Sequence, residues 1–292
     1  MNYPIVSVET HDGLCLYGLL LETQNKENIF INIHGTASNF YEEPFIETFS
    51  KYFIENGISL LSTNNRGAGV YDAYQKSGAA TEKFEDCVID IDTWISFVLD
   101  KGYKNIILSG HSLGTEKVVY YMNNGKYADR ILSVVLLAPS DSFGSHRLHD
   151  GNTNPRKKEV ENLLSESKKI IDFGESDKFL PRNTYGSHEG IMPKSAYSFM
   201  NFLGLESKLL NALPLVTEKL EAYSNIKIPI LVAIGDQSEY TGLTIKRALE
   251  LMQNENKNTS IFQLKNCNHD FDGKEEELSK IVLDFAQIHL TK

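Results

Sequence analysis

A serine stands between two glycines at the point where an apolar strand pattern changes into a helical one. Residues 110–114 read Gly-His-Ser-Leu-Gly, follow the apolar run at 105–108, and precede helix-forming residues. In a sharp strand-to-helix turn the backbones pass so closely that the positions two before and two after the central residue must be small. The segment therefore predicts a β-strand, a tight turn that presents Ser112, and an α-helix.

The rest of the chain alternates short apolar runs with amphipathic segments. Strands are predicted at 3–8, 14–21, 29–33, 58–62, 105–108, 133–137, 228–234 and 260–264, and helices at about 45–53, 82–101, 115–122, 241–255 and 275–290. An Asp12-Gly13 turn joins the first two strands, so we expect them to form an antiparallel edge. Strands that are apolar throughout and alternate with helices are typical of a mostly parallel sheet with helices on both faces.

The alternation is interrupted between residues 142 and 226. Polar segments with glycine and proline surround helical stretches there, at 159–171 and 196–210. The interruption is too long for an ordinary strand-to-helix connection and too helical for a linker. We therefore predict one α/β core, residues 1–141 and 227–292, with a lid or cap inserted at 142–226.

Composition narrows the expected partners. The chain has 29 Lys and Arg against 39 Asp and Glu, a formal net charge of −10, and only a short basic patch at 156–158, so we expect no nucleic-acid partner. It has no secretory leader pattern and no apolar run approaching ~18 residues, which predicts a cytoplasmic protein without a membrane span. The three cysteines are far apart and lack metal-ligand spacing, so we expect reduced thiols and no metal.

Two backbone N–H groups are candidates for an oxyanion hole. Leu113 follows Ser112 at the start of the helix, where free N–H groups and the helix dipole favour negative charge. Thr36 follows His34-Gly35 at the end of the strand at 29–33, and folds with such a serine turn take their second donor from a loop after an earlier strand. We therefore predict that Thr36 and Leu113 stabilise a negatively charged substrate oxygen.

His269 is the predicted general base. The chain has eight histidines, and His269 is the one that lies after the last predicted strand and before the last predicted helix. When a serine turn of this kind is catalytic, the order along the chain is serine, acid, histidine. Position therefore favours His269 as the group that accepts the Ser112 proton.

Several residues are candidates for the acid that would orient His269. The turn after the strand at 228–234 reads Gly-Asp-Gln-Ser-Glu-Tyr. In folds with such a serine turn, the acid is commonly the aspartate of a Gly-x-x-Asp sequence, and that position is Ser238 here, which is not acidic. Asp236 and Glu239 flank that position, and either could orient the imidazole of His269. Asp141, after the preceding strand, and a serine-histidine dyad without an acid remain as further alternatives.

With these residues in place, the chain resembles the α/β-hydrolase superfamily over nearly its full length. More narrowly, it is similar to the lid-bearing group that includes fungal siderophore esterases. The matching segments are His34-Gly35, Ser-Asn-Phe-Tyr at 38–41, Asn65-Arg66-Gly67, the serine turn, Ala-Pro-Ser-Asp at 138–141, Glu239-Tyr240, and His269 with residues 271–278.

The resemblance implies a serine hydrolase that cleaves an ester, thioester or amide bond of a small or peptide-like metabolite. Ser112, His269 and a loop acid would form its catalytic triad, and no cofactor is expected. Two alternatives stay open from the sequence. The same residues would serve an acyltransferase or cyclase if water were excluded, and the fold could also be kept by a non-catalytic ligand-binding protein.

Overall fold

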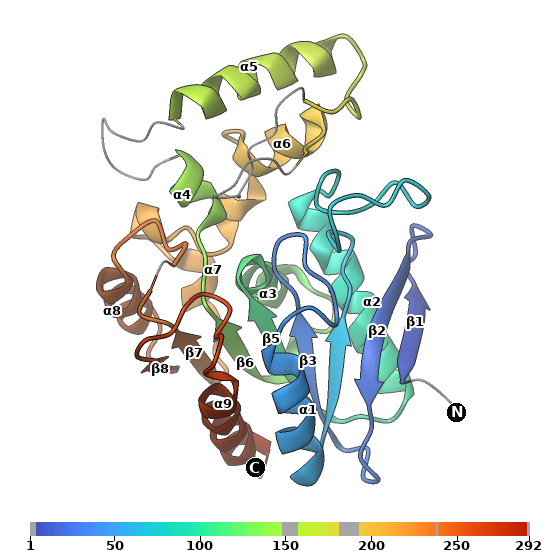
Figure 1. Ribbon diagram of the computed structural model, residues 1–292, viewed down its shortest axis with the longest axis vertical. Coiled ribbons are helices and arrows are strands. Elements are labelled where there is room, and N and C mark those ends of the chain that lie inside the picture. The colour runs from blue at the N-terminus through green and yellow to red at the C-terminus, as the bar shows by residue number, and fades with distance from the viewer. Residues whose placement is uncertain (1–3, 148–156, 181–192, 238, 291–292) are drawn as a thin grey trace.

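An eight-stranded sheet forms the centre of the computed structural model, which describes residues 4–147, 157–180, 193–237 and 239–290 (Figure 1). The strands are β1 (Ile5–Glu9), β2 (Cys15–Leu21), β3 (Asn28–Ile33), β4 (Ile58–Thr63), β5 (Asn105–His111), β6 (Ile131–Leu137), β7 (Ile230–Ile234) and β8 (Thr259–Gln263). They lie in the order β1-β2-β4-β3-β5-β6-β7-β8. The β1–β2 and β2–β4 pairs are antiparallel and the others are parallel. The mostly parallel sheet and its antiparallel edge are thus confirmed.

Helices cover both faces of this sheet. Helices α2 (Cys87–Asp100), α3 (Leu113–Asn124) and α8 (Ile245–Glu255) pack on one face, and α1 (Phe45–Glu55) and α9 (Glu275–Leu290) pack on the other. Successive strand residues point to opposite faces. In β5, Ile106 and Leu108 lie in the first core and Ile107 lies in the second. Burial on both faces is the reason that the parallel strands are apolar throughout.

Four helices lie in the described part of the chain between β6 and β7. They are α4 (Ser142–Arg147), α5 (Lys157–Asp172), α6 (Ala196–Leu203) and α7 (Glu221–Ser224), with 3₁₀ turns at Lys208–Asn211 and Leu215–Thr217 before α7. Two further 3₁₀ turns lie earlier in the chain, at Phe84–Asp86 before α2 and Ala128–Arg130 before β6. Figure 1 shows α5 and α6 beyond the end of the sheet, next to α4. The helix predicted at 196–210 ends at Leu203, because Gly204 follows and leaves the helical conformation.

A third hydrophobic cluster joins this region to the helix that follows Ser112. It combines residues of α4, α5 and α6 with Leu113 and Tyr120 of α3 and with Phe84. The last part of the segment between β6 and β7 belongs to the core of the sheet. Its buried residues lie in the core under α2, α3 and α8, and they are Leu213, Leu215, Leu220, Tyr223 and Ile226. The domain boundaries at 141/142 and 226/227 stay a prediction.

Among the residues that the structure describes, no helix combines the length and the apolar character needed to cross a bilayer. The cytoplasmic location and the lack of a nucleic-acid partner stay predictions from the sequence.

Candidate active site

Ser112 lies at the tight turn between β5 and α3. Its backbone has φ 53° and ψ −125°, a conformation that residues with a side chain rarely adopt. Ser112 N donates a 3.0 Å hydrogen bond to Leu137 O at the end of β6, and Thr115 N donates a 2.8 Å hydrogen bond to Ser112 O. The neighbouring strand and the first turn of α3 therefore hold the strained residue in place.

Gly110 and Gly114 are required by close backbone contacts around this turn. A Cβ atom on Gly110 would lie 2.2 Å from Gly114 O, and a Cβ atom on Gly114 would lie 2.2 Å from Ile33 O. Both distances are far shorter than van der Waals contact. The steric reason that the sequence suggested for the two glycines is confirmed.

The imidazole of His269 is paired with the carboxylate of Glu239. His269 Nδ1 and Glu239 Oε2 lie 2.6 Å apart, the Glu239 side chain is fully buried, and the His269 side chain is 13% exposed. Gly235 N donates to the other carboxylate oxygen at 3.1 Å, and the ring of Tyr240 packs edge-on against His269 at 4.7 Å. This pairing directs the Nδ1–H group toward the carboxylate and keeps Nε2 free to accept a proton.

Asp236 lies in the same turn as Glu239, but its carboxylate points elsewhere. Asp236 Oδ1 accepts a hydrogen bond from Cys267 N at 3.1 Å. Backbone hydrogen bonds from Cys267 and Asn266 lower the pKa of Asp236, and the residue is exposed. The structure thus brings Glu239, and not Asp236, to the imidazole of His269. Ser238 lies outside the described residues.

Asp141 is also engaged away from His269. Its two oxygens accept hydrogen bonds from Gly144 N at 2.6 Å and from Val216 N at 2.8 Å. The carboxylate therefore ties the start of α4 to the 3₁₀ turn before α7, and burial raises the pKa of Asp141 to about 6. These contacts give Asp141 a structural position beside the site.

A cleft of about 460 Å³ brings the predicted residues together. Ser112, His269 and Thr36 all line it. Gly35 packs directly against the serine, since a Cβ atom added to Gly35 would lie 3.0 Å from the Cβ atom of Ser112. Leu113 begins α3 immediately beside this cleft, with its side chain buried.

His34 fixes the peptide that carries the Thr36 N–H group. Asn65 N donates to His34 Nε2 at 3.2 Å, so the ring proton is on Nδ1, which lies 2.7 Å from Gly35 O. Burial lowers the pKa of His34 to about 4, which keeps the ring neutral. Because the carbonyl and the next N–H belong to one planar unit, holding Gly35 O also sets the direction of the Thr36 N–H.

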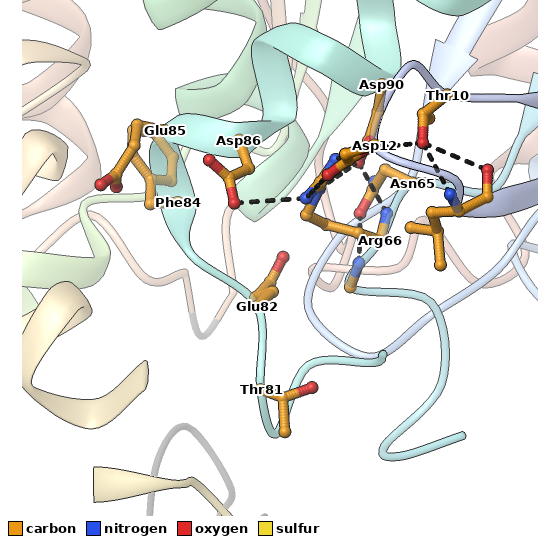
Figure 2. Close-up of polar contacts among 12 residues, drawn as sticks. Thr10, Asp12, Asn65, Arg66, Thr81, Glu82, Phe84, Glu85, Asp86 and Asp90 are labelled. Carbon is orange, nitrogen blue, oxygen red and sulfur yellow. Dashed lines mark hydrogen bonds and ion pairs between the residues drawn. The ribbon is translucent and has the colours of Figure 1, made fainter. Parts of the chain in front are cut away.

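The loop that supplies Asn65 is anchored by charge pairs, as Figure 2 shows. The Arg66 guanidinium lies within 3.2 Å of three carboxylates, those of Asp12, Asp86 and Asp90. Asp90 is fully buried and also accepts a hydrogen bond from Arg66 N at 2.7 Å. The network joins the end of β4 to the β1–β2 turn and to the start of α2 (Figure 2), so the contact between Asn65 and His34 rests on a fixed loop.

One wall of the cleft rests on Glu116, one turn after Ser112 on α3. Ser140 Oγ donates to the Glu116 carboxyl at 2.9 Å, and Ser142 N donates to it at 3.0 Å. Both serines line the cleft. Burial and the nearby carboxylate of Asp141 raise the pKa of Glu116 to about 8. No sequence motif pointed to this residue.

Glu43 and His111 were also not predicted as site residues, although both line the cleft. Glu43 is buried just before α1 and is 68 positions from His111, with which it pairs. No local pattern could have indicated this pairing. Within the described part of the chain, no group of three or more His, Cys, Asp or Glu side chains is arranged to hold a metal ion.

Comparison with known proteins identifies relatives across most of the chain. The family model described as "Protein of unknown function (DUF1749)" matches residues 5–283. Among curated proteins, the polyketide transferase grgF of Penicillium sp. is 23% identical over 241 residues, which are 82% of this chain and 70% of that protein.

Solved structures share the fold at low sequence identity. The crystal structure of the α/β hydrolase GrgF from Penicillium sp. sh18 matches with a TM-score of 0.69 at 16% identity and covers all of both chains. Est1E from Butyrivibrio proteoclasticus, with ferulic acid bound, matches with a TM-score of 0.66 at 16% identity over 98% of this chain and all of that one. These likenesses confirm the predicted α/β-hydrolase fold. The chain therefore belongs to the family described as "Protein of unknown function (DUF1749)" and has the fold of the α/β hydrolases.

Proposed function

We propose that the protein is a serine-dependent acyl hydrolase or acyltransferase that works through an acyl-enzyme at Ser112. The observation that carries the proposal is the 2.6 Å pair of His269 and buried Glu239 in the cleft that Ser112 also lines. A hydroxyl on a strained turn, a buried carboxylate and an imidazole, in that order along the chain, are the groups that acyl transfer requires in this fold.

The first half of the reaction forms the acyl-enzyme. His269 Nε2 accepts the Ser112 hydroxyl proton as Ser112 Oγ attacks the carbonyl carbon of an ester, thioester or amide. The N–H groups of Thr36 and Leu113 donate to the oxyanion of the tetrahedral intermediate. The intermediate then collapses, the bond to the leaving group breaks, and the leaving group departs with the proton from His269. Glu239 stays ionised and stabilises the imidazolium.

The second half releases the acyl group. His269 takes a proton from water as the water oxygen attacks the acyl-enzyme, and it returns that proton to Ser112 Oγ as the carboxylic acid leaves. If an alcohol, thiol or amine of a second substrate or of the same substrate replaces water, the product is a transferred or cyclised acyl group. All steps use groups of the chain and the reactants, so the proposal invokes no cofactor.

Acyl transfer is kept as the second candidate because the curated relative is named a polyketide transferase. The bound ferulic acid of Est1E belongs to a protein of the same fold and supports a small aromatic acyl substrate as one candidate here. The cleft volume of about 460 Å³ lies within the range of sites for small molecules. We propose that the predicted insertion at 142–226 forms the lid over the cleft with its part before Leu213, since Ser142, Ser145 and His146 line the cleft and Leu213 already belongs to the sheet core.

A substrate panel tests the proposal. Activated esters, thioesters and anilides of short acyl chains would be assayed with the wild type, with Ser112→Ala and with the control Ser50→Ala on α1. We expect Ser112→Ala to lose several orders of magnitude in kcat and the control to keep the wild-type rate, because triad members act as a unit. More than roughly a tenth of wild-type kcat in Ser112→Ala would rule out the nucleophile. No turnover and no acyl-enzyme with any compound would favour a non-catalytic binding protein.

A further inference from the structure

The imidazole of His111 lies buried between two hydrogen-bond acceptors. Its Nδ1 is 3.2 Å from Glu43 Oε1, and its Nε2 is 3.0 Å from the backbone oxygen of His269. Its side chain is 6% exposed and that of Glu43 is 4% exposed. A neutral imidazole has only one N–H group, so an imidazolium is the form that donates to a carboxylate and to a carbonyl at the same time.

The Glu43 carboxylate accepts two further hydrogen bonds. Asn32 Nδ2 donates to one carboxylate oxygen at 2.7 Å, and Gly35 N donates to the other at 3.3 Å. Hydrogen bonds from N–H groups stabilise a carboxylate over a carboxylic acid. Burial by itself lowers the pKa of His111, but the charge and hydrogen bond of Glu43 outweigh burial and leave the pKa raised.

These contacts make Glu43 and His111 a junction between separate parts of the site. Glu43 binds the end of β3 through Asn32 and the segment before Thr36 through Gly35. His111 is the residue before Ser112, and it reaches across 158 positions of sequence to the backbone of His269. The nucleophile, the oxyanion donor and the base therefore all adjoin one buried pair.

We propose that Glu43 and His111 are positioning residues, which as a buried ion pair hold His269 and the Gly35–Thr36 segment in register with Ser112. The inference rests on the proposed function, because it assigns these residues a part in the same acyl transfer. Neither residue exchanges a proton with substrate. Their effect passes through the residues that they hold.

The pair has a second effect on His269, through charge. The two imidazole rings lie 5.1 Å apart between centroids, and a cationic neighbour at that distance disfavours a second positive charge. The charged groups that face His111 are Glu43 before α1 and Asp270 in the loop before α9, and the rings of Phe45 and Phe271 fill the remaining sides. We therefore expect the pH profile of Ser112 labelling to respond when the charge of His111 is removed.

The test measures how fast a fluorophosphonate labels Ser112 between pH 5 and pH 9. The variants are His111→Gln and Glu43→Gln, and the control is Tyr223→Phe, which removes a buried hydrogen bond to Thr259 at the start of β8. Because misplaced reacting groups can cost about 100-fold, we expect the two variants to label roughly 10- to 100-fold more slowly at pH 7. The midpoint of the acid limb should rise in His111→Gln, which removes the cation, and should rise less in Glu43→Gln. The control should keep the wild-type midpoint.

Variants with wild-type rates and midpoints would overturn the inference. Slower labelling would also overturn the inference if the pH midpoint stayed at the wild-type value and the loss of rate matched the loss of folded protein. A purely structural role would give that result. An unlabelled wild type would overturn the proposed function, and this inference with it. A measurement on the wild type covers the case in which the variants do not fold. With ¹⁵N-labelled histidine, the His111 ring should carry protons on both nitrogens at pH 7, and a ring with one proton would contradict the proposal.

Discussion

Glu239 Oε2 lies 2.6 Å from Nδ1 of His269, with the carboxylate fully buried and the imidazole at the wall of the cleft. The contact joins the turn after β7 to the loop before α9, which are 30 positions apart in the sequence. A carboxylate in this position sets the tautomer of the ring and stabilises the imidazolium. The proposed function can therefore be tested by exchanging one oxygen of Glu239 for an amide nitrogen.

Glu239→Gln should lower kcat by about three to four orders of magnitude, because an amide neither fixes the Nδ1–H tautomer nor stabilises the imidazolium. Asp236→Asn is the matched control, since Asp236 lies in the same turn and binds Cys267 N instead. We expect its kcat to stay within about threefold of the wild type, since it makes no contact with the triad. Steady-state kinetics on an activated ester check both variants. Equal losses, or a larger loss in Asp236→Asn, would contradict the assignment of Glu239.

The buried carboxyl of Glu116 should make stability depend on pH. Burial raises its pKa from the ordinary 4.5 to about 8, so between these values the folded state binds a proton that the unfolded state releases. Stability from this group is present below about pH 4.5 and is lost as the pH rises through about 8. Urea unfolding at pH 5.5 and pH 8.5 should therefore show Glu116→Gln gaining stability relative to the wild type at the higher pH. The exposed control Glu55→Gln should show no such change, and an equal difference at both pH values would refute the prediction.

The charge of the cleft should select among substrates. Its described lining includes the carboxylates of Glu42, Asp270 and Asp272 and no Lys or Arg. We expect kcat/KM to fall from an ester with a cationic acyl chain to its neutral isostere and then to an anionic analogue, by several-fold at each step in low salt. Added salt should reduce the differences in kcat/KM among the three esters. The Asp270→Asn substitution should reduce these differences as well. A preference for the anionic ester would contradict this prediction.

Shortening the segment between β6 and β7 should change selectivity more than folding. Replacing residues 148–211 with a short flexible linker keeps Leu213, Leu215, Leu220 and Tyr223, which belong to the core of the sheet. Far-ultraviolet circular dichroism should show that the sheet remains, and activity on a small activated ester should persist while discrimination among larger esters is lost. Complete unfolding would show that the segment is part of the main core.

Much of the fold could be predicted because its signals are local. Apolar strands buried on both faces read as continuous apolar runs, as in β3 and β5. The serine turn carries its own steric signature in Gly110 and Gly114, and chain order selected His269 from eight histidines.

The parts that could not be predicted depend on contacts between distant segments. Asp236 and Glu239 lie three positions apart, and only the path of their turn decides which one reaches His269. The Glu43–His111 pair spans 68 positions, and the bonds of Glu116 span 24 and 26, with no motif for either. Helix α6 ends at Leu203, although apolar residues at helical spacing continue to 210 in the sequence. Gly204 ends the helix there.

Ser112 is tested as the nucleophile most directly by covalent labelling with a fluorophosphonate and mass spectrometry of the digested protein. We expect one phosphonyl adduct on the peptide that contains Ser112 in the native wild type, with slower labelling in Glu239→Gln. The adduct should be absent from Ser112→Ala and from wild-type protein unfolded before labelling. No adduct on native protein, or an adduct on another serine that persists in Ser112→Ala, would contradict the proposal that this protein transfers acyl groups through Ser112.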